Sequence, residues 1–246
     1  MIAIKINDLT KVYKDVIAVD KLNLEIKEGE LFALLGVNGA GKTTTIKMLS
    51  SLTNPTSGDA LVYGHSISTD SEKIKGLIDI SMQETAIARK LTVAENIEFY
   101  AELSGQNRDE IAETKKYVFD AFGLEKVADK QASKLSGGWQ RKLSIALALV
   151  TKPKVLFLDE PTLGLDVLAR RELWKTIQAL KSKMTIILTT HYMEEAEALA
   201  DRIGIMKDGK LLFCGDKEAL FKQTKKQSVE DAFIEIVSGG ENGIYK

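Results

Sequence analysis

The sequence predicts an α/β fold built around a parallel sheet, with helices inserted into it. A buried strand over 31–35 leads directly into the pattern G-x-x-x-x-G-K-[ST] at 36–43, and a helix is expected over 44–49. A second continuous apolar strand, over 154–158, ends in two acidic residues. Continuous apolar strands are typical of parallel sheets, whose two faces are both covered. Strand patterns are dense before about residue 82 and after about residue 154, so the helices between them form an expected insertion.

The segment 36–43 has the features of a loop that binds phosphate groups. Glycines let the backbone come close to a ligand, and successive N–H groups at the start of a helix form an anion site. In this pattern Lys42 would contact the β- and γ-phosphates, and the Thr43 hydroxyl would bind Mg²⁺. A glycine-rich turn that matches by chance is the alternative, but the flanking strand and helix disfavour it. The candidate nucleotide-binding residues are Gly36, Val37, Asn38, Gly39, Ala40, Gly41, Lys42, Thr43 and Thr44.

The two acidic residues that end the strand over 154–158 are candidates for catalysis. Ligands of open α/β sheets bind at the carboxyl ends of the strands. Asp159 is expected to hold Mg²⁺, directly or through water, and Glu160 to orient or deprotonate an attacking water. The alternative is a strand that ends in solvated acids, which the phosphate-binding pattern upstream disfavours.

Three further side chains are weaker candidates by themselves. Gln83 follows a short predicted strand and could bind a metal or position a water, although most glutamines in such places are only solvated. His191 follows an apolar strand at the same expected sheet edge as Glu160, which favours a phosphate contact. Tyr13 lies in a turn between two predicted strands, where a half-buried surface tyrosine is favoured over a platform for a flat base.

A second glycine-containing segment, Leu135-Ser136-Gly137-Gly138-Trp139-Gln140-Arg141, precedes a predicted helix. Ser136 could cap that helix, which is expected to run to Val150. The two glycines would also expose backbone N–H groups as a second anion site, and the residues leave both interpretations equally open. Further along, Asp166 is expected to be the N-cap of a helix over 167–180.

Composition limits the class of protein. The chain has 246 residues, enough for one large or two small domains. Its formal net charge of −1 gives no argument for nucleic acid as a partner. Cys214 is the only cysteine, so no intrachain disulfide is expected, which fits a reducing, cytoplasmic setting. Because no apolar run approaches the ~20 residues needed to cross a bilayer, we do not expect the chain to span a membrane by itself, and docking on one stays open.

Taken together, these motifs resemble the ATP-binding subunits of ABC transporters. The Walker A loop at 36–43, the signature at 135–138, the Walker B strand ending at Glu160, and then Asp166 and His191 have that family's order and spacing. The resemblance covers nearly the whole chain, and the signature is specific because other P-loop enzymes lack it. It implies a P-loop NTPase core with an antiparallel β subdomain and an inserted α-helical subdomain over about 84–152. The ABC ATPase domain would span 1–237, followed by a flexible tail over 238–246.

The resemblance also implies roles for the matching residues. Tyr13 would stack on adenine, which reverses the interpretation above, and Gln83 would contact Mg²⁺ and sense the membrane partner. Trp139 stands where many members carry Gln or Met. The implied catalytic residues are Lys42, Glu160 and His191; the metal-binding residues are Thr43, Gln83 and Asp159. The signature residues Ser136, Gly137 and Gly138 would bind the ATP held by the opposite subunit, and Asp166 would contact that subunit.

The function implied by the resemblance is ATP hydrolysis coupled to transport. The family works as a head-to-tail dimer that encloses two ATP molecules with Mg²⁺ and drives separately encoded transmembrane permease subunits. The chain would form a homodimer, or a heterodimer with a second ABC ATPase subunit, on the cytoplasmic face of the cell membrane. Segments 189–197 and 228–233 resemble the bacterial drug and antibiotic exporter branch. A soluble ABC ATPase of iron–sulfur cluster assembly, or of another non-transport process, is the alternative.

Overall fold

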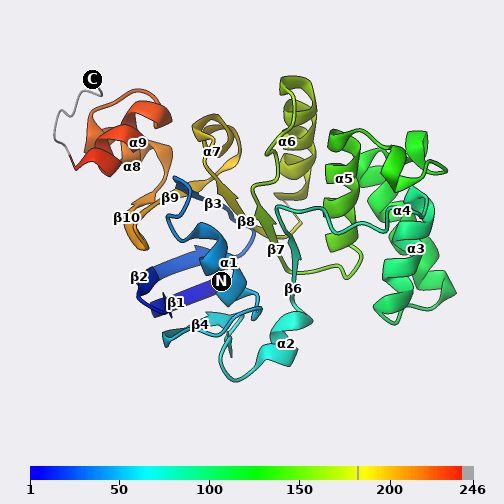
Figure 1. Ribbon diagram of the computed structural model, residues 1–246, viewed down its shortest axis with the longest axis horizontal. Helices are drawn as coiled ribbons and strands as arrows, with labels where there is room; N and C mark the ends of the chain where they lie inside the picture. Colours follow the sequence, from blue (N-terminus) through cyan, green and yellow to red (C-terminus); the bar gives the residue numbers. More distant parts are fainter. Residues whose placement is uncertain (182, 240–246) are drawn as a thin grey trace.

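Two β-sheets organise the protein (Figure 1). The computed structural model describes residues 1–181 and 183–239. The first sheet is antiparallel, with strand order β2-β1-β4-β5. It forms the antiparallel β subdomain that the fold class requires. Its strands are β1 (Ile2–Tyr13), β2 (Val16–Lys27), β4 (Ser57–Val62) and β5 (His65–Ser66).

The second sheet has six strands in the order β10-β9-β3-β8-β7-β6. All of its pairings are parallel except that of β10 with β9. The carboxyl ends of β3, β6, β7 and β8 therefore lie along one edge, where ligands of open α/β sheets bind. The strands are β3 (Leu31–Gly36), β6 (Ile78–Ser81), β7 (Val155–Asp159), β8 (Thr185–Thr190), β9 (Arg202–Lys207) and β10 (Lys210–Gly215).

The helices follow the predicted plan of a core with an insertion. Helices α3, α4 and α5 come between β6 and β7 in the chain and gather at the end of the molecule away from β1 and β2 (Figure 1). Two short 3-10 turns, η1 (Leu124–Val127) and η2 (Ala132–Lys134), join α4 to α5. The helices are α1 (Lys42–Leu49), α2 (Ser71–Lys75), α3 (Val93–Leu103), α4 (Arg108–Phe122), α5 (Gly137–Ala148), α6 (Val167–Lys181), α7 (Met193–Leu199), α8 (Lys217–Thr224) and α9 (Val229–Ser238).

Strand β3 separates two hydrophobic cores. Leu31, Ala33 and Leu35 belong to the core formed with the inserted helices and the C-terminal helices. Phe32 and Leu34 belong to the core formed with the antiparallel sheet and α1. Because successive side chains of a strand point to opposite faces, a strand buried on both faces has a continuous apolar sequence, which is the pattern that predicted β3.

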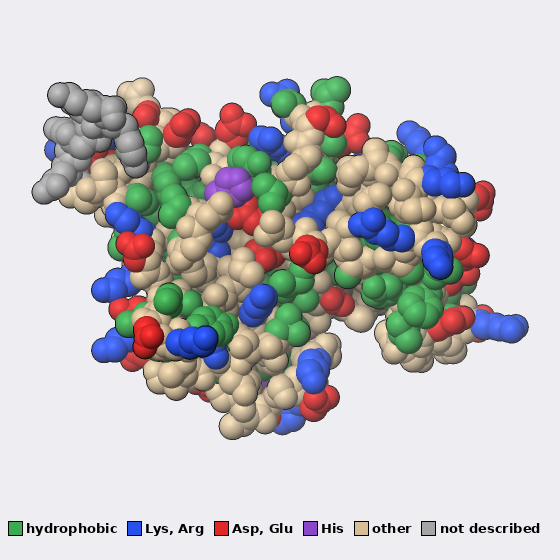
Figure 2. Space-filling view, viewed as in Figure 1, with side chains coloured by type: hydrophobic (Ala, Val, Ile, Leu, Met, Phe, Trp, Pro, Cys, Tyr) green, Lys and Arg blue, Asp and Glu red, His purple; other side chains and the backbone are tan. Residues whose placement is uncertain are grey.

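Helix ends differ slightly from their predicted positions. Helix α5 ends at Ala148 rather than Val150, and α9 includes Ser238, the first residue of the predicted tail. The rest of that tail, 240–246, lies outside the described residues. Among the helices that the structure describes, none is both long and apolar enough to cross a bilayer. Acidic and basic side chains are interspersed over the face shown in Figure 2.

Candidate nucleotide-binding and hydrolysis site

The loop between β3 and α1 opens into a cavity of about 560 Å³. Residues 38–44 line it together with Tyr13, Gln83, Glu160 and His191. The loop packs tightly on β2: Gly41 has φ 104°, and a Cβ there would lie 2.3 Å from the carbonyl oxygen of Ala18. Only glycine fits that position, as the phosphate-binding pattern requires. The structure thus brings most of the predicted site residues to one cavity.

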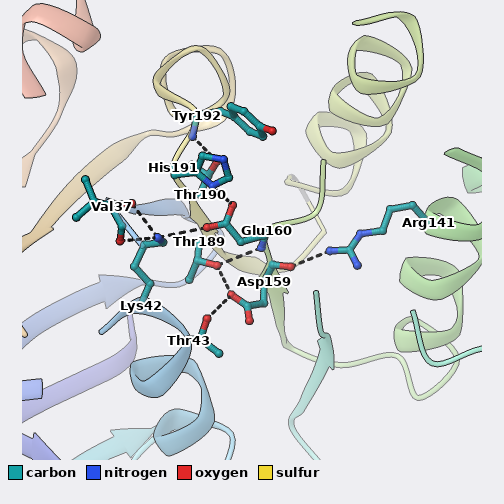
Figure 3. A network of polar contacts seen from close by, with 11 residues as sticks. Val37, Lys42, Thr43, Arg141, Asp159, Glu160, Thr189, Thr190, His191 and Tyr192 are labelled. Carbon is teal, nitrogen blue, oxygen red and sulfur yellow. Dashed lines mark hydrogen bonds and ion pairs between the residues drawn. The ribbon is translucent and has the colours of Figure 1, made fainter. Parts of the chain in front are cut away.

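Lys42 and His191 hold Glu160 from two sides (Figure 3). The Lys42 side chain is buried, and its Nζ lies 3.3 Å from Oε1 of Glu160. The same ammonium donates hydrogen bonds to the carbonyl oxygens of Gly36 (2.8 Å) and Val37 (3.3 Å), the two loop residues outside the cavity lining. His191 Nδ1 lies 2.7 Å from Oε2 of Glu160. Since a carboxylate can only accept, this contact places a proton on Nδ1 when Glu160 is ionised.

Glu160 has an unusual backbone conformation. Its φ of 49° lies in the left-handed region, which is unfavourable for a residue with a side chain. Strand β8 stabilises it, because the Glu160 N–H donates to the carbonyl oxygen (3.1 Å) and the Oγ1 (3.2 Å) of Thr189. Such conformations persist where the surrounding structure enforces them, commonly at functional sites. No pattern in the sequence predicted this strain.

Asp159 has the surroundings of a metal ligand. Its side chain is completely buried, and Oδ1 accepts hydrogen bonds from Thr43 Oγ1 (3.1 Å) and from Thr189 Oγ1. Oδ2 is buried without a hydrogen-bond partner among the described residues. Gln83 lines an adjoining cavity of about 520 Å³ together with Thr43 and Asp159. A carboxylate oxygen with free lone pairs, beside a hydroxyl and an amide, suits Mg²⁺, which prefers oxygen ligands.

The signature segment opens on a different part of the surface. Ser136 and Gly137 are exposed at the start of α5, and neither lines the cavity of the phosphate-binding loop. Ser136, Gly138 and Trp139 instead line a small hollow of about 60 Å³ beside α6. Ser136 is the N-cap residue, but its side chain makes no capping hydrogen bond. Its hydroxyl is therefore available to a ligand. Of the two interpretations, side-chain capping is not observed, and the anion site stays a prediction.

Asp166 and Tyr13 lie at two other places around the site. Asp166 Oδ1 accepts hydrogen bonds from the N–H groups of Leu168 (2.9 Å) and Ala169 (3.0 Å), which confirms it as the N-cap of α6. Tyr13 is 44% exposed at the cavity of the loop, with Lys11 Nζ 5.0 Å from its ring centre. That Asp166 contacts a second subunit stays a prediction. That Tyr13 stacks on adenine also stays a prediction.

Two buried charged residues near the site have no predicted role in the sequence analysis. Arg141, on α5, is only 4% exposed. Burial lowers the pKa of its guanidinium to about 10, against the opposing effect of the nearby Asp159, Glu195 and Glu160 carboxylates. At neutral pH the group is therefore still a cation. The sequence feature that could have pointed to a buried Arg141 is its position, two residues before the largely apolar stretch that begins at Leu143.

Glu195, on α7, is completely buried. Its Oε1 accepts a hydrogen bond from Nε1 of Trp174 (3.0 Å), and burial raises the pKa of the carboxyl. The sequence showed only an acidic helix in this region. Spacing could have predicted that Glu195 is buried. Glu195 precedes the buried Leu199 by four residues and therefore lies on the same face of the helix.

The sequence is similar to that of known ATP-binding proteins. The sequence profile of the family described as ABC transporter matches residues 19–163. The chain is 46% identical over 226 residues to the human phospholipid-transporting ATPase ABCA3, covering 90% of this chain and 13% of that protein. It is 38% identical over 240 residues to YbhF of Escherichia coli, a probable multidrug ABC transporter ATP-binding protein, covering 95% of this chain and 41% of that one. The chain thus spans less than half of the length of either relative.

A solved structure extends the comparison to three dimensions. It is a dimeric ATP-binding cassette in a post-hydrolysis state, bound to ADP and phosphate. The TM-score is 0.77 at 26% identity, covering 87% of this chain and 98% of the other. Fold and site together define a P-loop NTPase that binds ATP. The chain belongs to the ABC transporter family, in which it corresponds to an ATP-binding cassette.

The buried Glu195 generates a prediction about stability and pH. Because the folded state raises its pKa, the folded state binds this proton more tightly, and stability is lost as pH rises above the ordinary glutamate value of 4.5. Glu195→Gln removes the titration while keeping an acceptor for Trp174. We expect the stability of the variant, relative to the unmodified chain, to increase as pH rises above 4.5. Urea unfolding followed by circular dichroism measures this difference, and a difference independent of pH would contradict the prediction.

Proposed function

We propose that this chain hydrolyses Mg²⁺-ATP at sites shared between two ATPase subunits, and that hydrolysis powers the transmembrane subunits of an exporter. The observation that carries the proposal is the position of Glu160, held between Lys42 and His191 in the cavity of the phosphate-binding loop. The signature at 136–138 opens elsewhere on the same chain. A complete site then needs a second subunit.

Nucleotide binding would use the cavity at the end of β3. The backbone N–H groups of the loop and the N-terminus of α1 favour phosphate oxygens there. Lys42, already at the floor of the loop, would add a positive charge to the β- and γ-phosphates. Tyr13, exposed at the cavity of the loop, offers its ring to adenine. Nucleotide binding in this cavity is supported by the solved structure of the similar cassette, which is bound to ADP and phosphate.

Hydrolysis would depend on the carboxylate of Glu160. A water placed between the γ-phosphate and Glu160 would attack the γ-phosphorus while one of its protons passes to the carboxylate, which acts as general base. The bond from that phosphorus to the oxygen of the β-phosphate would break, and ADP would be the leaving group. His191 fixes one oxygen of that carboxylate through Nδ1. Thr43, Asp159 and Gln83 would hold Mg²⁺, which neutralises charge on the β- and γ-phosphate oxygens.

The second half of each site would come from the partner's signature. Gly137 and Gly138 present N–H groups at the N-terminus of α5, and the Ser136 hydroxyl makes no capping bond. A two-fold arrangement would place each signature on the ATP bound by the other subunit and produce two equal sites. Asp166, at the start of α6, would contact the partner. Because one chain carries both halves, a homodimer suffices, and a heterodimer with a related subunit would work in the same way.

The transport role is proposed from the named relatives. One is named as a phospholipid-transporting ATPase and the other as a probable multidrug ABC transporter protein. We infer that this chain acts as a peripheral protein on the cytoplasmic face of the cell membrane. There it would drive permease subunits that are separate chains.

Replacing the proposed base should separate binding from turnover. Glu160→Gln keeps the size of the side chain but removes its ability to accept a proton, so we expect turnover to fall about 10²–10⁴-fold while ATP still binds. Phosphate release measures turnover, and size-exclusion chromatography with ATP measures the dimer, which should persist in the variant. Glu194→Gln, at a side chain that is 82% exposed, is the matched control and should keep normal turnover. Normal turnover in Glu160→Gln would exclude the base role.

Mixing two inactive variants tests whether each site is shared. Lys42→Ala removes the phosphate contact but keeps the signature. Gly137→Asp places a negative charge in the signature, and a Cβ at that position would meet nothing within 4 Å, so the fold should tolerate it. In a mixed dimer one site combines the intact loop of one chain with the intact signature of the other. A one-to-one mixture should recover about a quarter of normal activity, because half of the dimers are mixed and each has one intact site.

Either variant alone should be nearly inactive, and this provides the baseline for the mixture. If each chain completes its own site, mixing gives no recovery, and the head-to-tail arrangement is wrong. Dilution offers a second readout, since a shared site requires turnover that rises more steeply than linearly with protein concentration.

Association with a permease distinguishes transport from the soluble alternative. The tagged Glu160→Gln chain, purified with ATP from membranes solubilised in mild detergent, should bring a multi-span membrane protein with it. Mass spectrometry identifies the bound protein, and Lys42→Ala serves as the control. Recovery of soluble scaffold proteins alone, such as those of iron–sulfur cluster assembly, would contradict the transport proposal while leaving ATP hydrolysis intact.

A further inference from the structure

Arg141 joins three segments that are far apart in the sequence, and its contact with Asp159 is drawn in Figure 3. Its side chain, on α5, is only 4% exposed. Nε donates to the carbonyl oxygen of Pro161 (2.8 Å), and Nη2 donates to that of Asp159 (2.8 Å). Nη1 donates to the carbonyl oxygens of Met82 (2.6 Å) and Gln83 (3.1 Å). The guanidinium thus connects α5 to the ends of both β6 and β7.

All four acceptors of Arg141 are main-chain carbonyls, so the contact depends on where the backbone lies rather than on which side chains are present. Pairing between β6 and β7 ends at Ser81 and Leu158. Arg141 continues the connection beyond that point, at Gln83. The planar guanidinium, with five N–H donors in a fixed geometry, can serve several such acceptors at once.

Arg141 and the signature residues Gly137 and Gly138 lie on the same helix, α5. Helix α5 begins at Gly137, so Arg141 lies about one turn after the signature residues and moves with them as part of one helix. Arg141 itself does not line the cavity of the phosphate-binding loop. Two of its four acceptors, the carbonyl oxygens of Gln83 and Asp159, belong to residues that do line a cavity of the site.

We propose that Arg141 is a positioning residue that fixes Gln83 and the Asp159–Glu160 backbone relative to the signature end of α5. The inference rests on the proposed function, because the signature matters for turnover only if it completes a shared site. ATP binding by the loop at 36–43 does not need Arg141. Turnover does, because the base, the metal ligands and the signature must hold a common geometry.

Arg141→Lys tests this role. Lysine keeps the positive charge but offers a single ammonium on a flexible stem, which cannot reproduce the planar fork. We expect the dissociation constant for fluorescent methylanthraniloyl-ATP to stay within about twofold, while kcat falls about a hundredfold, the scale expected for a misplacement of about 1 Å. Steady-state phosphate release gives kcat, and fluorescence titration gives nucleotide affinity and the number of binding sites per chain.

Arg202→Lys is the matched control. Arg202 is partly buried, with 28% of its side chain exposed, and it contacts the carboxylate of Glu30 and the carbonyl oxygen of Glu25. It pairs with Phe32 on the same sheet, at the end of β3 opposite to the phosphate-binding loop. Its loss should cost comparable stability, measured by thermal unfolding, without lowering kcat by more than about twofold.

Amide hydrogen exchange provides a readout that general destabilisation would not produce. In Arg141→Lys, exchange should increase in the peptide that contains 82–86 and stay unchanged in the peptide that contains 36–43. The proposal is overturned if kcat is unchanged, or if Arg202→Lys lowers kcat equally, or if exchange increases uniformly along the chain. An unmodified chain that fails to bind the nucleotide would overturn the proposed function instead.

Discussion

The parallel pairing of β3, β8, β7 and β6 is the constraint on which the site depends. The register places Leu35 beside Thr190 and Asp159 beside Thr189, so the residues that follow these strands emerge at one edge. Residues separated by more than a hundred positions are thereby within contact distance, as Lys42 Nζ and Glu160 Oε1 are at 3.3 Å. Apolar side chains on both faces stabilise this arrangement, and hydrogen bonds between the strands fix it. The chemistry at the edge follows from the sheet.

The site concentrates buried charge that a stable core would avoid. Lys42 and Arg141 are cations, and Asp159 and Glu160 are carboxyl groups, all of them less than a tenth exposed. Removing such groups from water is costly unless each is paired and hydrogen-bonded. Here most of their polar atoms do have partners, and the orphaned Oδ2 of Asp159 lies where we propose a metal ion. Fixed charges in a poorly solvated cavity act strongly on a developing negative charge, which suits phosphoryl transfer.

The two halves of the proposed site differ in how they are built. In the loop half, Gly41 packs against β2 and the Lys42 side chain is buried, while residues 37–39 are exposed. The signature half is an exposed helix N-terminus, which is suited to closing over a ligand held by another molecule. In the proposed dimer, ATP is the ligand that joins the two subunits, so nucleotide binding stabilises their association. Arg141 is the feature that links both halves within one chain.

The sequence by itself determined the local features of this protein. The apolar strand before Gly36, the loop pattern with its helix, and the carboxylates after β7 are contiguous patterns, so the parallel sheet and most of the candidate site could be predicted. The tertiary structure decided what depends on contacts between remote segments. It set the strand order, the left-handed backbone of Glu160, and the four carbonyl acceptors of Arg141. It also shows that the Ser136 side chain makes no capping hydrogen bond, because whether a hydroxyl caps its helix depends on its conformation, and not on its place in the sequence.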